Sequence, residues 1–472
     1  MPWYADGDGA VDVRGTNSPA VLLRARDLGA GTPGELDGFG GAIAIGDLDG
    51  DDCSDLVIGA DAEGQSGASD GAGGNEGQVH IVFGAAGGIT TAGAITLPHD
   101  SAHLDRFGHA LALSTRWVGN VKVHDLYVGA PGATVGGKKQ AGEVFRYTIT
   151  PSTGSRITAS LREVRSQSSA GVPGASETGD GFGSVLAAVD GDGHGDGFSR
   201  PSPDEVIGGS GVLVGAPNEA IGSKREAGAI WYLRVDSAGA VRSSQNWSQN
   251  TAAVPGTAET GDHFGAALSA RNQWAVVGVP DENDGSKADS GLLQVFKRSP
   301  STGKFSPGKA LTQDSAGVPG TLEAGDRFGT AVAVGEALNC QEATDLAGGA
   351  PGEDIGSHRD AGSITLISLD DLGCASRSLY QGSGLAGAAE SGDEVGSVLG
   401  LTRGRIDLDE DYSDGLLIGV PQEDIGAVAE AGMVQPSHGG ITANGVLNTT
   451  LKFSKGYPLT NFYGMVLSSA SD

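Results

Sequence analysis

A short signal that recurs along the whole chain is the strongest constraint on how the chain can fold. It consists of a Phe-Gly pair or a close variant, and its copies start near residues 39, 107, 182, 264, 328, 395 and 462. Each of the first six copies is followed by a short, mostly apolar stretch that ends in Gly and usually in a Pro two residues later, as in the Gly-Ala-Pro at the end of residues 125–131. Neighbouring copies are 64 to 82 residues apart. This period fits a four-stranded blade and is too long for one coil of a solenoid.

The composition agrees with short strands joined by tight turns. Glycine accounts for 81 of the 472 residues and aromatic residues for 5%, which argues against a helical bundle. We therefore predict an all-β fold, a seven-bladed β-propeller of four-stranded antiparallel blades that forms a single domain over residues 1–472. The seventh blade is expected to combine residues 462–472 with residues 1–36. Pairing of the N- and C-terminal strands would then close the ring without an exposed edge.

The loop after the first strand of the first repeat has the pattern of a metal site. Its first, third, fifth and ninth positions are Asp47, Asp49, Asp51 and Asp55. Carboxylates at this spacing bring several hard oxygen ligands around one point, an arrangement that suits Ca²⁺. The alternative interpretation is a solvated turn without a metal.

The order of these signals, a Phe-Gly pair, an Asp-rich loop and then Gly-Ala-Pro, resembles the FG-GAP repeats of integrin α-subunit heads and of many secreted bacterial proteins. The resemblance covers nearly the entire chain. It implies Ca²⁺ ligation by Asp47, Asp49, Asp51 and Asp55 together with the backbone carbonyl of Cys53. Partial matches to this loop follow in the third blade, the sixth blade and the split blade: Asp190, Asp192 and Asp196; Asp407, Asp409 and Asp411; and Asp6, Asp8 and Asp12. The second, fourth and fifth blades lack the acidic run and are expected to be metal-free.

Charge and cysteine content narrow the classes of partner and compartment. The formal net charge of −29 repels nucleic acid, and no apolar run approaches the roughly 20 residues that span a bilayer. Weak Ca²⁺ loops suit the Ca²⁺ concentration outside cells, so we expect a secreted, extracellular protein from which any leader has been removed. In the fifth blade Cys340 precedes the second strand and Cys374 follows the third. This arrangement is compatible with a disulfide, and two separate buried thiols are the alternative.

The sequence lacks the common patterns of a catalytic centre. No His-Glu-x-x-His motif occurs, and no Gly-x-Ser-x-Gly stands on a strand-to-helix turn. We therefore expect a chain that is not an enzyme but a calcium-stabilised binding or adhesion module for a cell-surface glycan or protein. One alternative is a lectin module of a secreted bacterial protein or toxin assembly, in which tryptophans would stack on sugars. The other is an accessory domain of a secreted hydrolase such as a phospholipase.

Overall fold

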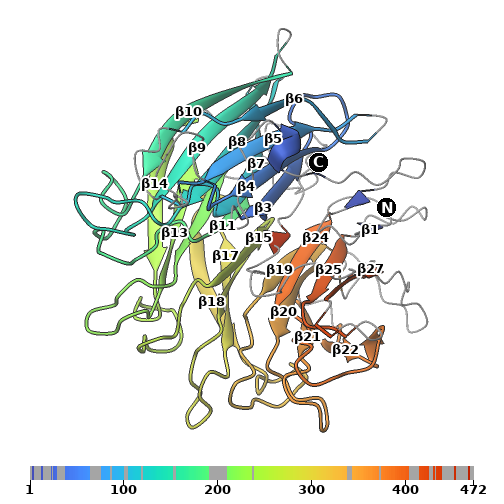
Figure 1. Cartoon of the computed structure of the whole chain (residues 1–472). Helices are drawn as coiled ribbons and strands as arrows, with labels where there is room; N and C mark the ends of the chain where they lie inside the picture. The colour runs from blue at the N-terminus through green and yellow to red at the C-terminus, as the bar shows by residue number, and fades with distance from the viewer. Residues whose placement is uncertain are drawn as a thin grey trace, which may run out of the picture.

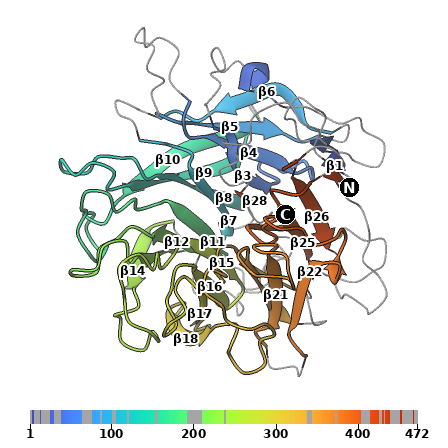
Figure 2. The same cartoon turned by 60° about the horizontal axis from the view of Figure 1, so that its bottom comes forward.

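The structure is a computed structural model that describes 20 segments of the chain. They are residues 3–4, 12–13, 23, 25–28, 38–63, 76–85, 88–99, 105–118, 121–152, 156–190, 210–236, 239–336, 338, 343–370, 374–402, 414–424, 429–430, 432–437, 451–452 and 466–467, some of them single residues. Six antiparallel four-stranded blades are arranged around a common centre (Figures 1 and 2). The predicted all-β propeller of four-stranded blades is therefore confirmed.

The strands of each blade follow one another in chain order. The first blade contains β3 (Phe39–Gly46), β4 (Asp55–Ala60), β5 (Gln78–Phe83) and β6 (Thr90–Thr96), and the second contains β7 (Ala110–Val118), β8 (Val121–Ala130), β9 (Glu143–Pro151) and β10 (Ile157–Arg165). The third contains β11 (Val185–Val189), β12 (Gly211–Ala216), β13 (Ala229–Val235) and β14 (Val241–Trp247), and the fourth contains β15 (Ala267–Arg271), β16 (Trp274–Val279), β17 (Leu292–Arg298) and β18 (Phe305–Leu311). The fifth contains β19 (Val332–Glu336), β20 (Thr344–Ala350), β21 (Ser363–Ser368) and β22 (Arg377–Gln381), extended by β23 (Gly384–Leu385), and the sixth contains β24 (Val398–Thr402), β25 (Gly415–Val420), β26 (Met433–Ser437) and β27 (Leu451–Lys452).

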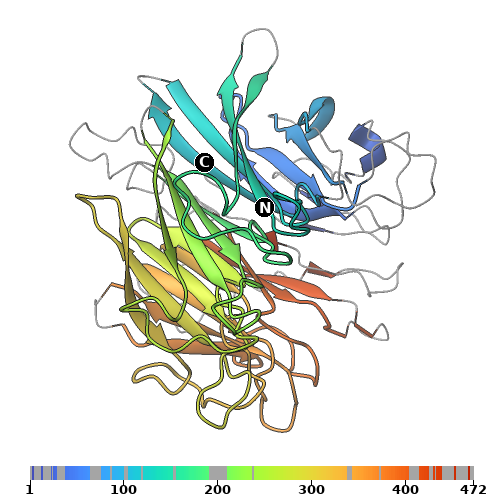
Figure 3. The ribbon, with the colours of Figure 1, turned by 90° about the vertical axis from the view of Figure 1, so that its left-hand side faces the viewer.

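The first strands of the blades line the centre of the ring. Contacts run from β3 to β7, from β7 to β11, from β11 to β15, from β15 to β19 and from β19 to β24. Figure 3 shows the ring from the side, with the first two blades in blue and teal above the green, yellow and orange blades. No helix in the described part of the chain is long and apolar enough to cross a membrane.

The count of seven blades was wrong, and so was the predicted pairing of the two chain ends. The described residues form six blades, and β1 (Trp3–Tyr4) pairs with β2 (Asp12–Val13) in a separate two-stranded sheet. The C-terminal strand β28 (Val466–Leu467) pairs in parallel with β3 and also contacts β24. It therefore joins the first and sixth blades directly.

Hydrophobic cores lie between blades rather than within them. Each of five buried clusters combines side chains from two consecutive blades, from the first and second around the ring to the fifth and sixth. The second strand of a blade is sandwiched between neighbours, so that all six residues of β12 are buried. Because a strand covered on both faces needs apolar residues at successive positions, these strands show no alternation of polar and apolar residues.

The Phe-Gly signal marks the seam between blades. Phe107, in the second copy of the signal, is fully buried. Its backbone amide donates to the carbonyl oxygen of Glu76 in the preceding blade at 3.0 Å. At the same seam a Cβ added to Gly59 would lie 2.1 Å from the carbonyl oxygen of Gly108. The following junctions show the same close approach: a Cβ added to Gly278 would lie 2.0 Å from the carbonyl oxygen of Gly329. The glycine near the end of the second strand is thus required for backbone contact between blades.

We predict that Gly278→Ala destabilises the protein by more than about 3 kcal/mol, the upper end of the cost of overpacking, because the new methyl group would meet a backbone carbonyl. Gly285→Ala is the matched control. Its Cβ would enter open space, so only the positive φ of 62° opposes it, at about 1 kcal/mol. Denaturant unfolding measures both variants, and equal losses would contradict the seam argument.

Candidate metal centre

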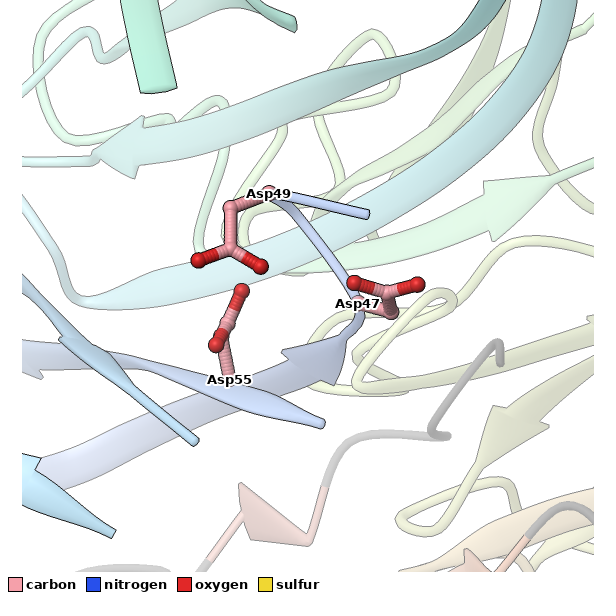
Figure 4. Close-up of side chains that lie close together, drawn as sticks. All are labelled: Asp47, Asp49 and Asp55. Atoms are coloured by element: carbon pink, nitrogen blue, oxygen red, sulfur yellow. The ribbon is translucent and has the colours of Figure 1, made fainter. Parts of the chain in front are cut away.

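Three carboxylates converge in the loop between β3 and β4. The closest oxygen atoms of Asp47, Asp49 and Asp55 all lie within 4.8 Å of one another, and Figure 4 shows the three side chains turned toward a shared space. Because Ca²⁺ binds oxygen at about 2.3–2.6 Å, oxygens on opposite sides of the ion are separated by about 5 Å. The spacing and the all-oxygen donor set therefore fit a Ca²⁺ ion.

Hydrogen bonds inside the loop set its shape. Asp47 Oδ1 accepts from the amides of Gly50 at 2.8 Å and Asp51 at 3.1 Å, and Asp49 Oδ1 accepts from the Asp51 amide at 3.2 Å. Asp52 takes the left-handed conformation, with φ of 64°, which Asp tolerates better than most residues. Asp47 and Asp49 thus each accept loop amides with one carboxylate oxygen, and these bonds hold the two carboxylates near each other.

Asp55 lies at the bottom of the loop, as the first residue of β4. It is fully buried, and its two oxygens accept from the backbone amides of Leu48 and Gly84, each at 2.8 Å. Burial raises the pKa of Asp55 to about 6, and the nearby carboxylates of Asp49 and Asp47 add to the rise while the two amides oppose it. A bound cation would offset this cost of burying negative charge.

A cationic side chain from the second blade reaches the same loop. Arg156 immediately precedes β10, and its Nη2 donates to Asp51 Oδ2 at 2.8 Å and to the carbonyl oxygen of Gly84 at 3.0 Å. Its Nε donates to Asp49 Oδ2, and the guanidinium carbon lies 4.6 Å from the ring centroid of Phe83. Asp51, a predicted ligand, is thus bonded to Arg156 and lies outside the group of three converging carboxylates. Sequence reasoning missed Arg156, since it is about 100 residues from the loop.

The remaining predicted ligand residues either make other contacts or lie outside the described residues. The Cys53 thiol is free, and burial together with Asp51 raises its pKa. Asp190 Oδ1 accepts from the Thr115 amide at 3.2 Å, and the Asp190 carbonyl accepts from Arg298 Nη2 at 3.0 Å. Asp12 lies in β2, and its side chain is outside the described residues. Also outside them are Asp6, Asp8, Asp192, Asp196, Asp407, Asp409 and Asp411.

The disulfide prediction is covered in part by the described residues. Cys374 is disulfide-bonded, and Cys340, its predicted partner, lies outside them. The pairing of Cys340 with Cys374 stays a prediction.

In the second blade a buried aspartate at the same strand position is neutralised by arginines. Asp125 of β8 is fully buried and lies four residues before the junction glycine Gly129, as Asp55 lies four residues before Gly59. Its carboxylate accepts from Arg116 Nε at 2.6 Å and from Arg146 Nη1 at 3.1 Å. Two side chains of the same blade thus supply positive charge where the first blade has its acidic loop.

The Gly-Ala-Pro loops carry a repeated cluster of amide and carboxyl groups. In four successive junctions a Gln at the end of the fourth strand of a blade, or just after it, donates to a Glu of the next blade, at 2.6 Å for Gln167 and Glu219 and at 2.5 Å for Gln249 and Glu282. The other two pairs are Gln313 with Glu353 and Gln381 with Glu423. Burial raises the pKa of Glu219, Glu282 and Glu353 to about 7. The Gln-to-Glu contact was not predicted, because the two residues belong to different blades.

With this geometry in view, the chain can be compared with known proteins. Residues 39–82 match the FG-GAP repeat. The FG-GAP match covers β3, the acidic loop, β4 and nearly all of β5, so the resemblance inferred from the sequence is confirmed for the first blade. A crystal structure of a protein from Lactobacillus plantarum is similar at 12% identity and a TM-score of 0.39, over 88% of this chain and 85% of that chain. No curated protein matches the sequence significantly.

The raised pKa of the junction glutamates predicts a pH-dependent stability. A carboxyl group with a folded-state pKa near 7 binds more protons in the folded than in the unfolded state between about pH 4.5 and 7, so its contribution to stability falls as the pH rises through that window. We expect Glu282→Gln to raise the melting temperature at pH 7.5 by roughly 1–2 °C and to leave it unchanged at pH 4. The control Glu259→Gln changes an exposed carboxylate of the same junction. An equal effect of Glu282→Gln at both pH values would refute the assignment.

Proposed function

We propose that the chain is a non-catalytic binding module whose first FG-GAP blade is stabilised by Ca²⁺. The observation that carries the proposal is the convergence of Asp47, Asp49 and Asp55 within 4.8 Å. These three carboxylates would hold the ion, and the Cys53 carbonyl and Asp51 are the further ligands expected from the loop pattern. Ca²⁺ would supply the positive charge that lets the buried Asp55 stay ionised.

The binding role follows from the propeller fold and its FG-GAP match, since this arrangement presents loops from several blades on each rim. We propose an extracellular location, because sites built from short acidic loops suit the Ca²⁺ concentration found there. The proposed partner is a protein or glycan at a cell surface. The net charge of −29 makes polyanions such as nucleic acid poor partners.

The placement of the tryptophans favours a protein ligand over a sugar. Trp231 and Trp247 are buried, at 1% and 5% exposure, and Trp231 Nε1 donates to the Pro173 carbonyl at 2.8 Å. One face of Trp274 is covered by Lys297, whose Nζ lies 4.5 Å from the ring centroid. Because a lectin pocket needs an open aromatic face, these rings serve packing within and between blades.

One group of side chains in the first blade resembles a catalytic triad and provides a test of the proposal that the chain is not an enzyme. His80 joins Thr96 Oγ1 at 3.0 Å and Glu63 Oε2 at 3.1 Å, the connectivity of a nucleophile, a base and an orienting carboxylate. Thr96 is exposed and is the cross-strand neighbour of His80 in the sheet, so pairing of β5 with β6 already accounts for the contact. We expect no labelling of Thr96 by a fluorophosphonate probe and no ester hydrolysis above that of Thr96→Ala.

Removing Ca²⁺ tests the proposed metal centre. We expect EDTA to lower the melting temperature by a few degrees, since a ligand at 100 times its Kd stabilises the folded state by about 2.7 kcal/mol. Asp49→Asn should abolish most of this shift. Asp52→Asn is the matched control, because it removes the same charge from the same loop at an exposed position. If the wild type melts at the same temperature with and without EDTA, the acidic loop is a metal-free turn.

The identity of the ligand is tested by binding the intact chain to a glycan array and to a library of cell-surface ectodomains, each with and without EDTA. We expect capture of a protein ectodomain. Selective binding of one glycan class would instead support the lectin alternative. Turnover of an ester or phosphodiester that survives in Thr96→Ala would support a hydrolase with another active site.

A further inference from the structure

The second blade holds Arg156 in position over the acidic loop of the first. The backbone fixes the residue, because the Ser152 amide donates to the Arg156 carbonyl at 3.0 Å across the end of the β9–β10 hairpin. The same hairpin touches the loop at Pro151, whose Cγ lies 3.6 Å from the Cβ position of Gly50. Arg156 is therefore placed by the packing of two blades, and 31% of its side chain is exposed.

Arg156 binds the outer half of the carboxylate cluster in the way a cation would. Its Nε and Nη2 contact Asp49 and Asp51, while Nη2 also contacts the carbonyl oxygen of Gly84. The Gly84 amide in turn donates to Asp55 at 2.8 Å. One guanidinium is thus connected to three of the four aspartates in the predicted ligand set, two directly and one through Gly84. A planar fork with several donors is suited to this bridging.

We propose that Arg156 is an internal cation of the acidic loop, which competes with Ca²⁺ for Asp49 and Asp51 and holds the first and second blades together when the ion is absent. The proposal rests on the Ca²⁺ site proposed above. Ligation of Ca²⁺ through Asp51 Oδ2 would place the ion in competition with Arg156, because the same Oδ2 lies 2.8 Å from the positively charged Nη2. Arg156 is a positioning residue that lowers Ca²⁺ affinity and stabilises the metal-free protein.

The test replaces Arg156 with Gln, which keeps most of the side-chain length and removes the charge. A positive charge bonded to two of the ligands costs on the order of tenfold in affinity for a divalent ion. We therefore expect Arg156→Gln to bind Ca²⁺ about tenfold more tightly in calorimetric titration with calcium chloride. In EDTA it should melt about 2 °C below the wild type, and this difference should vanish or reverse in excess Ca²⁺.

Two further variants separate charge from geometry. Arg165→Gln removes the same charge from the other end of β10, where the side chain contacts Glu163 at 2.8 Å rather than the loop, and should leave Ca²⁺ affinity unchanged. Arg156→Lys keeps the charge but loses the fork, so its affinity should lie between those of the wild type and Arg156→Gln. An equal gain in Arg165→Gln would reduce the effect to net charge and overturn the proposal.

The outcomes also distinguish this inference from the proposed Ca²⁺ site. If the wild type binds Ca²⁺ and Arg156→Gln binds it equally or more weakly, the metal centre stands and the competing role of Arg156 is refuted. If only Arg156→Gln binds Ca²⁺, Arg156 is the resident cation of the loop and the wild-type metal centre is refuted. If neither binds, both proposals are wrong.

Discussion

The approach of backbone to backbone at the five described junctions, from the first blade to the sixth, is the contact on which the ring depends. The glycine near the end of the second strand of one blade lies against the carbonyl of the Phe-Gly glycine in the next, at a distance that excludes any Cβ. The adjoining Phe is buried, and its amide bonds to the preceding blade. Because each of the five cores is shared by two blades, a blade separated from its neighbours would lose much of its buried surface, and the ring should unfold cooperatively.

Local sequence signals predicted the individual blades correctly. The number of blades was predicted wrongly, because it depends on strand pairing between residues far apart in the sequence. Phe-Gly and Gly-Ala-Pro are read correctly from the sequence because each is needed wherever two blades meet. The last copy, at residues 462–464, is the variant Phe-Tyr-Gly, and the strand after it spans two residues and pairs with β3 at the other end of the chain. Hydrogen bonds between strands are made by backbone groups, which all residue types share apart from the missing N–H of proline. The side chains of so short a strand therefore do not identify the strand with which it pairs.

In the candidate metal centre, too, the residues of one loop could be predicted, whereas a residue brought in from another blade could not. Asp47, Asp49 and Asp55 could be predicted because all three lie within nine residues of one loop, and the spacing alone brings them together. Arg156 could not, since only the packing of the second blade on the first places it there. The Gln and Glu of each junction are separated in the same way. Side chains that act within one loop are thus visible in the sequence, and those that act across a seam are visible only in the fold.

A buried aspartate, four residues before the glycine at the blade junction, occurs both in the blade that carries an acidic loop and in a blade that does not. Asp55 and Asp125 occupy this position in the first and second blades, and both are withdrawn from water. A buried carboxylate without a counter-charge is costly, so the position requires positive charge nearby. Asp125 receives it from two arginines of its own blade, while Asp55 accepts from backbone amides beside two further carboxylates. Arginine side chains therefore supply the counter-charge in the second blade, and Arg156 brings the same kind of side chain to the edge of the loop where a metal is proposed.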